Sequence, residues 1–277
     1  MHMSPKFPLN NGVAIDALGY GVYKVPATDC ADLVSTALDA GYRTVDTAAF
    51  YENEEGVGAA VNAAIAAGTP RGDIFVTSKV WNDRHGYDST LAAFDESLDK
   101  LGLDYLDMFL IHWPCPAHRK FIPTYKALEE LYHQGRVRAI GVSNFEPEHL
   151  HRLLENVDVV PAVNQVELHP WLQQRELRAL HAELGIATQA WSPLARGAIL
   201  TDPVLAKLAA AHGRRLAQVV LRWHVQSGHL VIPKASSPAR IAENLAVFDF
   251  ELTAADMAAI DALDRGFRSG SHPNFVN

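Results

Sequence analysis

Four polar residues lie where apolar, strand-like runs of the sequence end. Asp46 follows Tyr-Arg-Thr-Val, and Tyr51 lies in the loop just beyond it. Lys79 follows Ile-Phe-Val-Thr-Ser, and His112 follows a run that ends in Phe-Leu-Ile. A carboxylate, a phenol, an ammonium and an imidazole can together transfer a proton to a carbonyl compound. Because no metal-binding motif and no activated nucleophile compete for these residues, the sequence predicts a proton-transfer site.

Carbonyl reduction suits this set, because hydride addition to a carbonyl creates an alkoxide that needs a proton. Tyr51 is the expected donor of that proton. A free tyrosine has a pKa near ~10, and an ammonium at Lys79 is expected to lower the pKa of Tyr51. Asp46 is expected to keep a buried Lys79 protonated. His112 is expected to donate a hydrogen bond that polarises the substrate oxygen and orients the carbonyl.

Each of these residues also has an ordinary structural explanation. Asp46 could cap a helix, and Tyr51 could pack beside Phe50. Lys79 could be solvated, and His112 could be a hydrogen-bonded core histidine. A shared site is favoured because coincidence in all four positions is much less probable than coincidence in one.

The elements that must position these residues alternate as short apolar runs and longer helical patterns. Eight such pairs in about 250 residues predict a (β/α)8 TIM barrel, in which the carboxyl ends of the strands meet at one mouth. The rival fold, an open doubly wound sheet, requires a GxGxxG turn where this chain has Tyr23-Lys24-Val25-Pro26. The expected strands cover residues 18–25, 42–46, 74–79, 105–113, 139–145, 161–168, 187–194 and 230–235. The expected helices cover residues 29–41, 53–68, 88–102, 124–135, 147–156, 173–185, 202–213 and 237–248.

A turn at Asn10-Asn11-Gly12 precedes the first strand and helix pair. Short extended pieces flank this turn, so the segment predicts a β-hairpin. We expect this hairpin to plug the floor of the barrel and to carry no chemistry.

The composition fits a single domain over residues 1–277, because no linker or low-complexity stretch divides the pattern. The net charge of -8 repels phosphate backbones and anionic membranes, so neither nucleic acid nor membrane is an expected partner. Cys30 and Cys115 are expected to be reduced thiols. Without a signal-like or membrane-length apolar run, the sequence predicts a cytoplasmic protein.

Two loops combine cations with features that favour anions. The loops after the seventh and eighth strands of such barrels often bind phosphate. Residues 192–197 include Arg196 among small residues, which suits a pyrophosphate. The eighth loop supplies Lys234 and Ser236, then a helix start at Ser237-Pro238, and then Arg240. The alternative is a solvated loop with two ordinary surface cations.

Seven linked motifs resemble those of the aldo-keto reductases. They are VDTAAFYENEEGVGAA, VTSKVWN, FLIHWP, IGVSNF, PAVNQVELHP, AWSPLARG and IPKASSPARIAEN, and the similarity runs from about Leu18 to Asp264. The short stretch between Trp113 and Tyr125 is most similar to the bacterial 2,5-diketo-D-gluconic acid reductases. The resemblance implies an NADPH-dependent reduction of aldehydes or ketones, with 2,5-diketo-D-gluconate and related dicarbonyls as candidate substrates.

The resemblance also implies roles for individual residues. Tyr51 becomes the general acid/base, Lys79 and Asp46 its tuning pair, and His112 the orienting donor. The implied cofactor-binding residues are Ser143, Asn144 and Gln165 for the nicotinamide carboxamide, Trp191 for the nicotinamide ring, Ser192, Pro193, Leu194, Arg196 and Gly197 for the pyrophosphate, Lys234, Ser236 and Arg240 for the adenosine 2'-phosphate, and Glu243 and Asn244 for adenine. Without the family, Ser143 and Asn144 would read as a helix cap and Trp191 as core packing. Ala235 departs from the family pattern, because in the family a serine commonly follows the lysine that corresponds to Lys234.

Aromatic residues at the strand ends predict the substrate pocket. The expected substrate-binding residues are Tyr23, Phe50, Trp81, His112 and Trp113, and the tail 268–277 is expected to fold over the mouth. Apolar walls of this kind accept many carbonyl compounds. A non-catalytic NADPH-binding protein is the alternative function. A metal-dependent hydrolase is disfavoured because the chain contains no HExxH motif. A monomer is the family-level expectation.

Overall fold

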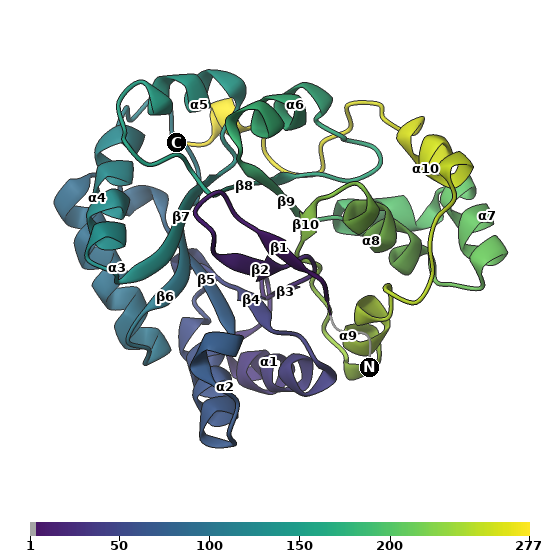
Figure 1. The fold of residues 1–277 in the computed structure, drawn as a ribbon, viewed down its shortest axis with the longest axis horizontal. Coiled ribbons are helices and arrows are strands. Elements are labelled where there is room, and N and C mark those ends of the chain that lie inside the picture. The colour runs from purple at the N-terminus through teal and green to yellow at the C-terminus, as the bar shows by residue number, and fades with distance from the viewer. Residues whose placement is uncertain (1–3) are drawn as a thin grey trace.

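Eight parallel strands, each a short run of mostly buried residues, follow one another around a curled sheet. The computed structural model describes residues 4–277, and the sheet order is β10-β9-β8-β7-β6-β5-β4-β3. Helices surround this sheet on its outer side (Figure 1). The strands are β3 (Tyr20–Gly21), β4 (Thr44–Asp46), β5 (Phe75–Val80), β6 (Leu106–Ile111), β7 (Val137–Ser143), β8 (Val163–Glu167), β9 (Ala187–Trp191) and β10 (Leu230–Val231).

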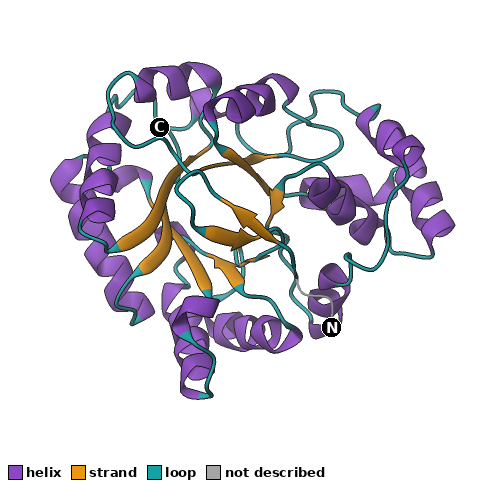
Figure 2. Ribbon diagram, viewed as in Figure 1, coloured by secondary structure: helices purple, strands orange, loops and turns teal. Residues whose placement is uncertain are grey.

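The helices follow the strands in the predicted alternation, which Figure 2 shows as strands inside a ring of helices. Cys30 and Val34 on the first helix, and Phe94 and Leu98 on the third, are among the residues that face the core. The helices are α1 (Ala27–Ala40), α2 (Glu54–Ala66), α3 (Tyr87–Leu101), α4 (Phe121–His133), α5 (Pro147–Leu154), α6 (Arg175–Leu184), α7 (Pro203–His212), α8 (Leu216–Gln226), α9 (Pro238–Leu245) and α10 (Ala254–Asp261).

The first and last strands of the sheet are joined by backbone hydrogen bonds. Val231 donates to Ala17 over 2.8 Å and accepts from Gly19 over 2.9 Å, and Leu18 and Val231 form a parallel bridge. The result is consistent with the predicted (β/α)8 barrel. Because all strands run parallel, their carboxyl ends lie at one end of the ring.

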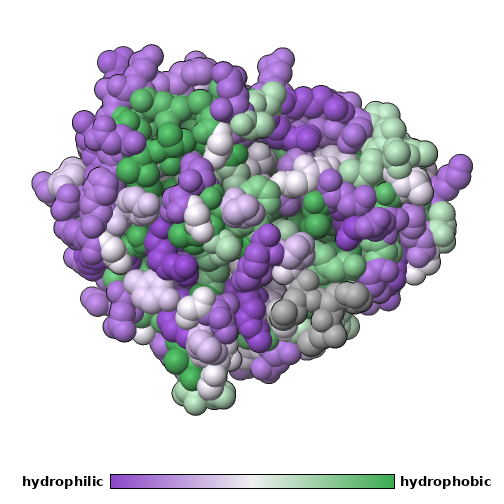
Figure 3. Space-filling model, viewed as in Figure 1, coloured by the Kyte–Doolittle hydropathy of each residue, from purple (hydrophilic) through white to green (hydrophobic). Residues whose placement is uncertain are grey.

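The predicted hairpin is present as β1 (Lys6–Pro8) and β2 (Ala14–Asp16), which pair antiparallel. Gly12, in the connecting turn, has a φ of 82°, a left-handed conformation that glycine adopts readily. Leu9 and Ile15 pack in one apolar cluster with strand residues that include Phe75 and Leu230. The face of the molecule that carries the hairpin mixes hydrophilic residues with hydrophobic patches (Figure 3).

The structure differs from the predicted elements in two respects. The first and eighth strands are only two residues long, because Lys24 turns out of the extended region at a φ of 58° and Pro233 has no N–H for a ladder. Helices α8 and α10 lie outside the eight expected helices; α8 packs against β10 and α9, and α10 packs against α7. None of the helices within residues 4–277 has the length and apolar character needed to cross a membrane.

Candidate active site

The predicted proton-transfer residues converge at the carboxyl ends of three neighbouring strands. Asp46 is the last residue of β4, Lys79 is the penultimate residue of β5, and His112 directly follows β6. Tyr51 ends the short 3-10 helix η1 (Ala49–Tyr51), which follows β4. Asp46, Tyr51 and His112 line one cavity of about 650 Å³, and Lys79 lies fully buried beneath it.

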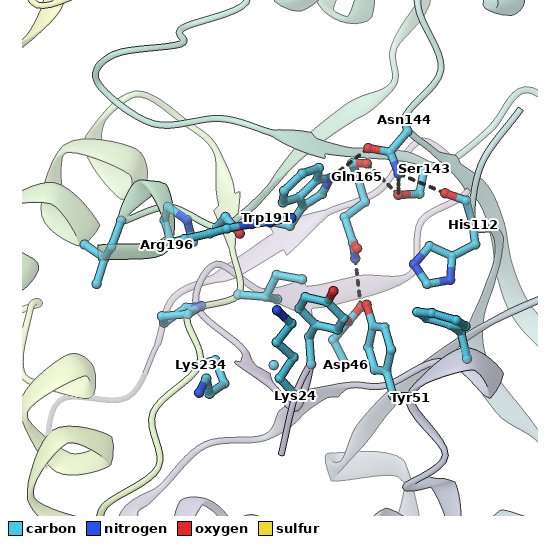
Figure 4. Close-up of a pocket in the computed structure, with 18 of the residues that line it drawn as sticks. Lys24, Asp46, Tyr51, His112, Ser143, Asn144, Gln165, Trp191, Arg196 and Lys234 are labelled. Carbon is cyan, nitrogen blue, oxygen red and sulfur yellow. Dashed lines mark hydrogen bonds between the residues drawn. The ribbon is translucent and has the colours of Figure 1, made fainter. Parts of the chain in front are cut away.

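All three donors of the Lys79 ammonium have acceptors. Its Nζ lies 2.6 Å from Asp46 Oδ1, 2.8 Å from the carbonyl oxygen of Thr47 and 3.3 Å from the hydroxyl oxygen of Tyr51. Because the Tyr51 oxygen accepts from Lys79, its own proton is free to be donated toward the cavity. Figure 4 shows Tyr51 and His112 together at this end of the cavity.

Burial dominates the acidity of these groups. It raises the pKa of the Tyr51 phenol well above its usual value, and the negative charge of Asp46 raises it further. It also lowers the pKa of the Lys79 ammonium, although the charge and hydrogen bond of Asp46 oppose that shift. For His112, burial and then the charge of Lys79 hold the pKa well below its usual value, so the imidazole is neutral at neutral pH.

The net shift of the Tyr51 pKa is therefore opposite to the lowering that was expected from Lys79. An ammonium favours the phenolate, but removal of the phenol from water and the nearby Asp46 carboxylate both favour the neutral form. The phenol consequently stays protonated at neutral pH, which is the form that a proton donor requires.

A second set of predicted residues is held by hydrogen bonds at the ends of β7, β8 and β9. Gln165 Nε2 donates to Asp46 Oδ2 over 2.7 Å, which ties this set to the proton-transfer group. Ser143 Oγ donates to the Gln165 carbonyl oxygen over 2.7 Å. The amide of Asn144 donates to the carbonyl oxygen of His112 over 2.9 Å and accepts from the indole N–H of Trp191 over 2.9 Å. These bonds fix the orientation of Trp191 at the wall of the cavity.

Cations line the opposite part of the cavity, on the left and centre of Figure 4. The predicted residues among its walls are Ser192, Pro193, Leu194, Arg196, Gly197, Lys234 and Arg240. Ser237 is the N-cap residue of α9 and Pro238 its first residue, as predicted. Ser236, Glu243 and Asn244 are not among the lining residues. The Glu243 carboxylate instead lies 3.3 Å from Arg215.

The predicted aromatic residues gather around His112. Phe50 stacks on Trp81 with ring centroids 3.8 Å apart, and the Trp81 centroid lies 4.9 Å from that of His112. Tyr23 and Trp113 also line the cavity. Ser271 and Val276 line it too, which agrees with the expectation that the tail reaches the mouth.

Sequence reasoning missed Lys24. It lies three residues beyond the end of β3 and lines the cavity near Lys234, as Figure 4 shows. Its sequence signal was the same as that of Lys234, namely a cation just beyond a short apolar strand. Including Lys24, the lining contains four cations, with Arg196, Lys234 and Arg240.

Comparison with known proteins agrees with this geometry. The model of the Aldo/keto reductase family matches residues 17–265, which is most of the chain. The chain belongs to the aldo/keto reductase family. An aldo-keto reductase of Mycolicibacterium smegmatis is 54% identical over 99% of both chains. The glyoxal reductase of Bacillus subtilis is 48% identical over 96% of this chain and 95% of its own length. A Gox0644 mutant, whose structure is of its complex with NADPH, has 46% sequence identity to this chain. The structural alignment covers 100% of both chains and has a TM-score of 0.94.

The side chains that line the cavity of this aldo/keto reductase carry the positive charges and hydrogen-bond donors that a dinucleotide phosphate requires. Four cations on a chain of net charge -8 provide a local anion site, and Trp191 provides an aromatic face at the end near Tyr51. Within residues 4–277, no three His, Cys, Asp or Glu side chains are grouped so that they could hold a metal ion.

The buried ion pair of Lys79 and Asp46 is expected to stabilise the reductase, because each charge compensates the other away from solvent. Lys79→Met leaves the Asp46 carboxylate buried without its cation, so the free energy of unfolding should fall by about 3–5 kcal/mol. Asp46→Asn/Lys79→Met removes both charges and should recover part of that loss. Urea denaturation of the three proteins measures the difference. A double variant no more stable than Lys79→Met would contradict this interpretation.

Proposed function

We propose that this protein reduces aldehydes and ketones to alcohols with NADPH, and that Tyr51 donates the proton. One observation carries the proposal: the Tyr51 hydroxyl accepts from the buried Lys79 ammonium over 3.3 Å, at one end of a cavity with four cations along its walls. Proton donor and anion site thus share one cavity. The NADPH complex of a relative 46% identical to this chain supports the choice of cofactor.

The cations and Trp191 bind different parts of NADPH in the proposed complex. Arg196 and Lys24 hold the pyrophosphate. Lys234 and Arg240 hold the 2'-phosphate, with Ser236 beside them and Glu243 and Asn244 toward adenine. Trp191 stacks on the nicotinamide. Gln165 Nε2 is already committed to Asp46 and Gln189, so Gln165 Oε1 is the atom that accepts from the carboxamide N–H.

NADPH supplies the hydride when it is bound, and the residues of the chain supply the proton. The neutral His112 imidazole donates a hydrogen bond to the carbonyl oxygen and so orients the carbonyl carbon. Tyr51 transfers its hydroxyl proton to the oxygen as the alkoxide forms. The phenolate that results faces the Lys79 ammonium, which stabilises it through the 3.3 Å contact.

Small dicarbonyl compounds such as glyoxal are the proposed substrates. A relative 48% identical to this chain is a glyoxal reductase, and the expected substrate walls are aromatic. The anionic 2,5-diketo-D-gluconate is the weaker candidate, because Tyr23, Phe50, Trp81 and Trp113 offer no positive charge to its carboxylate. A comparison of kcat/KM for the two compounds decides between them.

We also propose that residues 1–277 form one domain that acts as a cytoplasmic monomer, and that the β1 and β2 hairpin closes the end of the barrel opposite the site. The packing of Leu9 and Ile15 against strand residues supports that closure. The mass of the protein in solution, measured by light scattering, tests the monomer.

Tyr51→Phe should lower kcat for glyoxal reduction by about 10²–10⁴, because the phenyl ring has no proton to donate. NADPH absorbance measures turnover, and NADPH fluorescence should show that the cofactor still binds. Tyr105→Phe, which removes a hydroxyl outside the cavity, is the matched control. Full turnover by Tyr51→Phe would refute the proton donor, and turnover abolished by a chelator would point to metal chemistry instead.

The pH profile of reduction should be flat through neutral pH. Because burial raises the pKa of Tyr51 well above its ordinary value, the phenol keeps its proton through neutral and mildly alkaline pH, and reduction should decline only as the pH rises through that raised pKa. His112 should add no step between about pH 6 and 8, since its imidazole is already neutral there. Steady-state kcat/KM for glyoxal measures this. A decline centred near pH 7 that disappears in Tyr51→Phe would contradict the raised pKa.

Arg240→Ala should raise the dissociation constant for NADPH about tenfold or more, because a charge-assisted contact with the 2'-phosphate is lost. The dissociation constant for NADH, which lacks that phosphate, should change little. Fluorescence titration measures both. Arg175→Ala, which removes an exposed arginine outside the cavity lining, is the control. An equal rise in the dissociation constants for NADPH and NADH would refute the assignment of Arg240 to the 2'-phosphate.

A further inference from the structure

The C-terminal tail, residues 268–277, forms part of the cavity wall, and its one regular element is the short 3-10 helix η5 (Pro273–Phe275). Ser271 and Val276 line the cavity. The end of the tail reaches the loop that follows β6, where Asn277 Oδ1 accepts from the backbone N–H of Ala117 over 2.9 Å. Figure 1 shows this end beside α5. The tail therefore spans the mouth next to the loop that carries His112 and Trp113.

One buried carboxylate holds the beginning of this tail. Glu167, the last residue of β8, is fully buried. Its Oε1 accepts from the backbone N–H and from the hydroxyl of Ser269, each over 2.6 Å, and its Oε2 accepts from the Gly270 N–H over 2.9 Å. His169 Nε2 lies 3.1 Å from Oε1.

The carboxylate of Glu167 is ionised at any physiological pH. Burial by itself raises its pKa, but the hydrogen bonds from His169, Ser269 and Gly270 outweigh burial and lower the pKa to about 2. Hydrogen bonds to an ionised acceptor are roughly twice as strong as neutral ones. Two other side-chain contacts of the tail are exposed to solvent, namely Asn277 Oδ1 with the Ala117 N–H at 2.9 Å and Asn274 Nδ2 with Glu148 Oε1 at 3.2 Å.

The tail that Glu167 holds is pressed against Trp191. A Cβ built on Gly270 would lie 2.6 Å from Trp191 Cη2 and 3.0 Å from Glu167 Oε2, closer than side chains normally approach. Glu167 and Trp191 are paired on the adjacent strands β8 and β9. Trp191 is thus held at its indole N–H by Asn144 and at the far edge of its ring by the backbone of the tail.

We propose that Glu167 is a positioning residue for substrate selection: its carboxylate clamps Ser269 and Gly270 against Trp191 and so places Ser271 and Val276 on the wall that receives the carbonyl compound. This inference rests on the proposed reductase function for its kinetic part. A substrate large enough to touch the tail depends on the clamp, whereas glyoxal, which is too small to fill the pocket, does not.

Glu167→Gln tests the clamp, because the amide loses the charge and presents donors where the tail already presents donors. Hydrogen exchange of the peptide covering residues 265–277, followed by mass spectrometry, should become faster. At saturating NADPH, KM for phenylglyoxal should rise about tenfold, as expected for lost apolar pocket contacts, while kcat and the KM for glyoxal stay within about twofold. Glu148→Gln, which removes the exposed tail contact instead, should leave exchange near Gly270 and both KM values unchanged.

Gly270→Ala provides an independent variant in case Glu167→Gln does not fold. Its methyl group forces the tail away from Trp191 while Glu167 stays intact, so the KM for phenylglyoxal should rise selectively here too. Unchanged exchange in Glu167→Gln would overturn the clamp. Faster exchange with an unchanged ratio of the two KM values would overturn substrate selection. A wild-type protein that reduces neither aldehyde would contradict the proposed function, and the exchange rates would then decide the clamp alone.

Discussion

The buried ion pair between Lys79 and Asp46 is the interaction on which the site depends. The ammonium is fully buried, so it requires the carboxylate 2.6 Å away. The other oxygen of Asp46 accepts from Gln165, which connects the pair to the segment that fixes Asn144 and Trp191. A single charge pair therefore links the proposed proton-transfer residues and the proposed nicotinamide-binding residues in one hydrogen-bonded network.

Much of this network was accessible from the sequence because a barrel converts sequence position into spatial proximity. Asp46, Lys79 and His112 each end an apolar run, and parallel strands in a ring bring such ends to one mouth. The resemblance to aldo-keto reductases, which the family match confirms, added Gln165, 119 residues away from Asp46. The cofactor roles of Ser236, Glu243 and Asn244 remain predictions.

The features that escaped prediction depend on burial or on distant partners. The direction of the Tyr51 pKa shift follows from how much water the phenol loses, which no local motif encodes. Glu167 binds backbone groups 102 and 103 residues away, and the tail that supplies them has no regular periodicity. Helix α8 was overlooked because it is a second helix within one unit of the expected alternation.

The hydrogen bonds of Val231 with Ala17 and Gly19 make the junction of β10 and β3 the seam of the ring. Each of these two strands has only two residues, so this seam is held by fewer ladder bonds than the long pairings of β5, β6 and β7. On the ribosome, the ring cannot close until residue 231 has emerged. Lys24 and Lys234 stand just beyond the two strands of the seam, so a phosphate ligand held by both would bridge it, and ligand binding and ring closure would become linked equilibria.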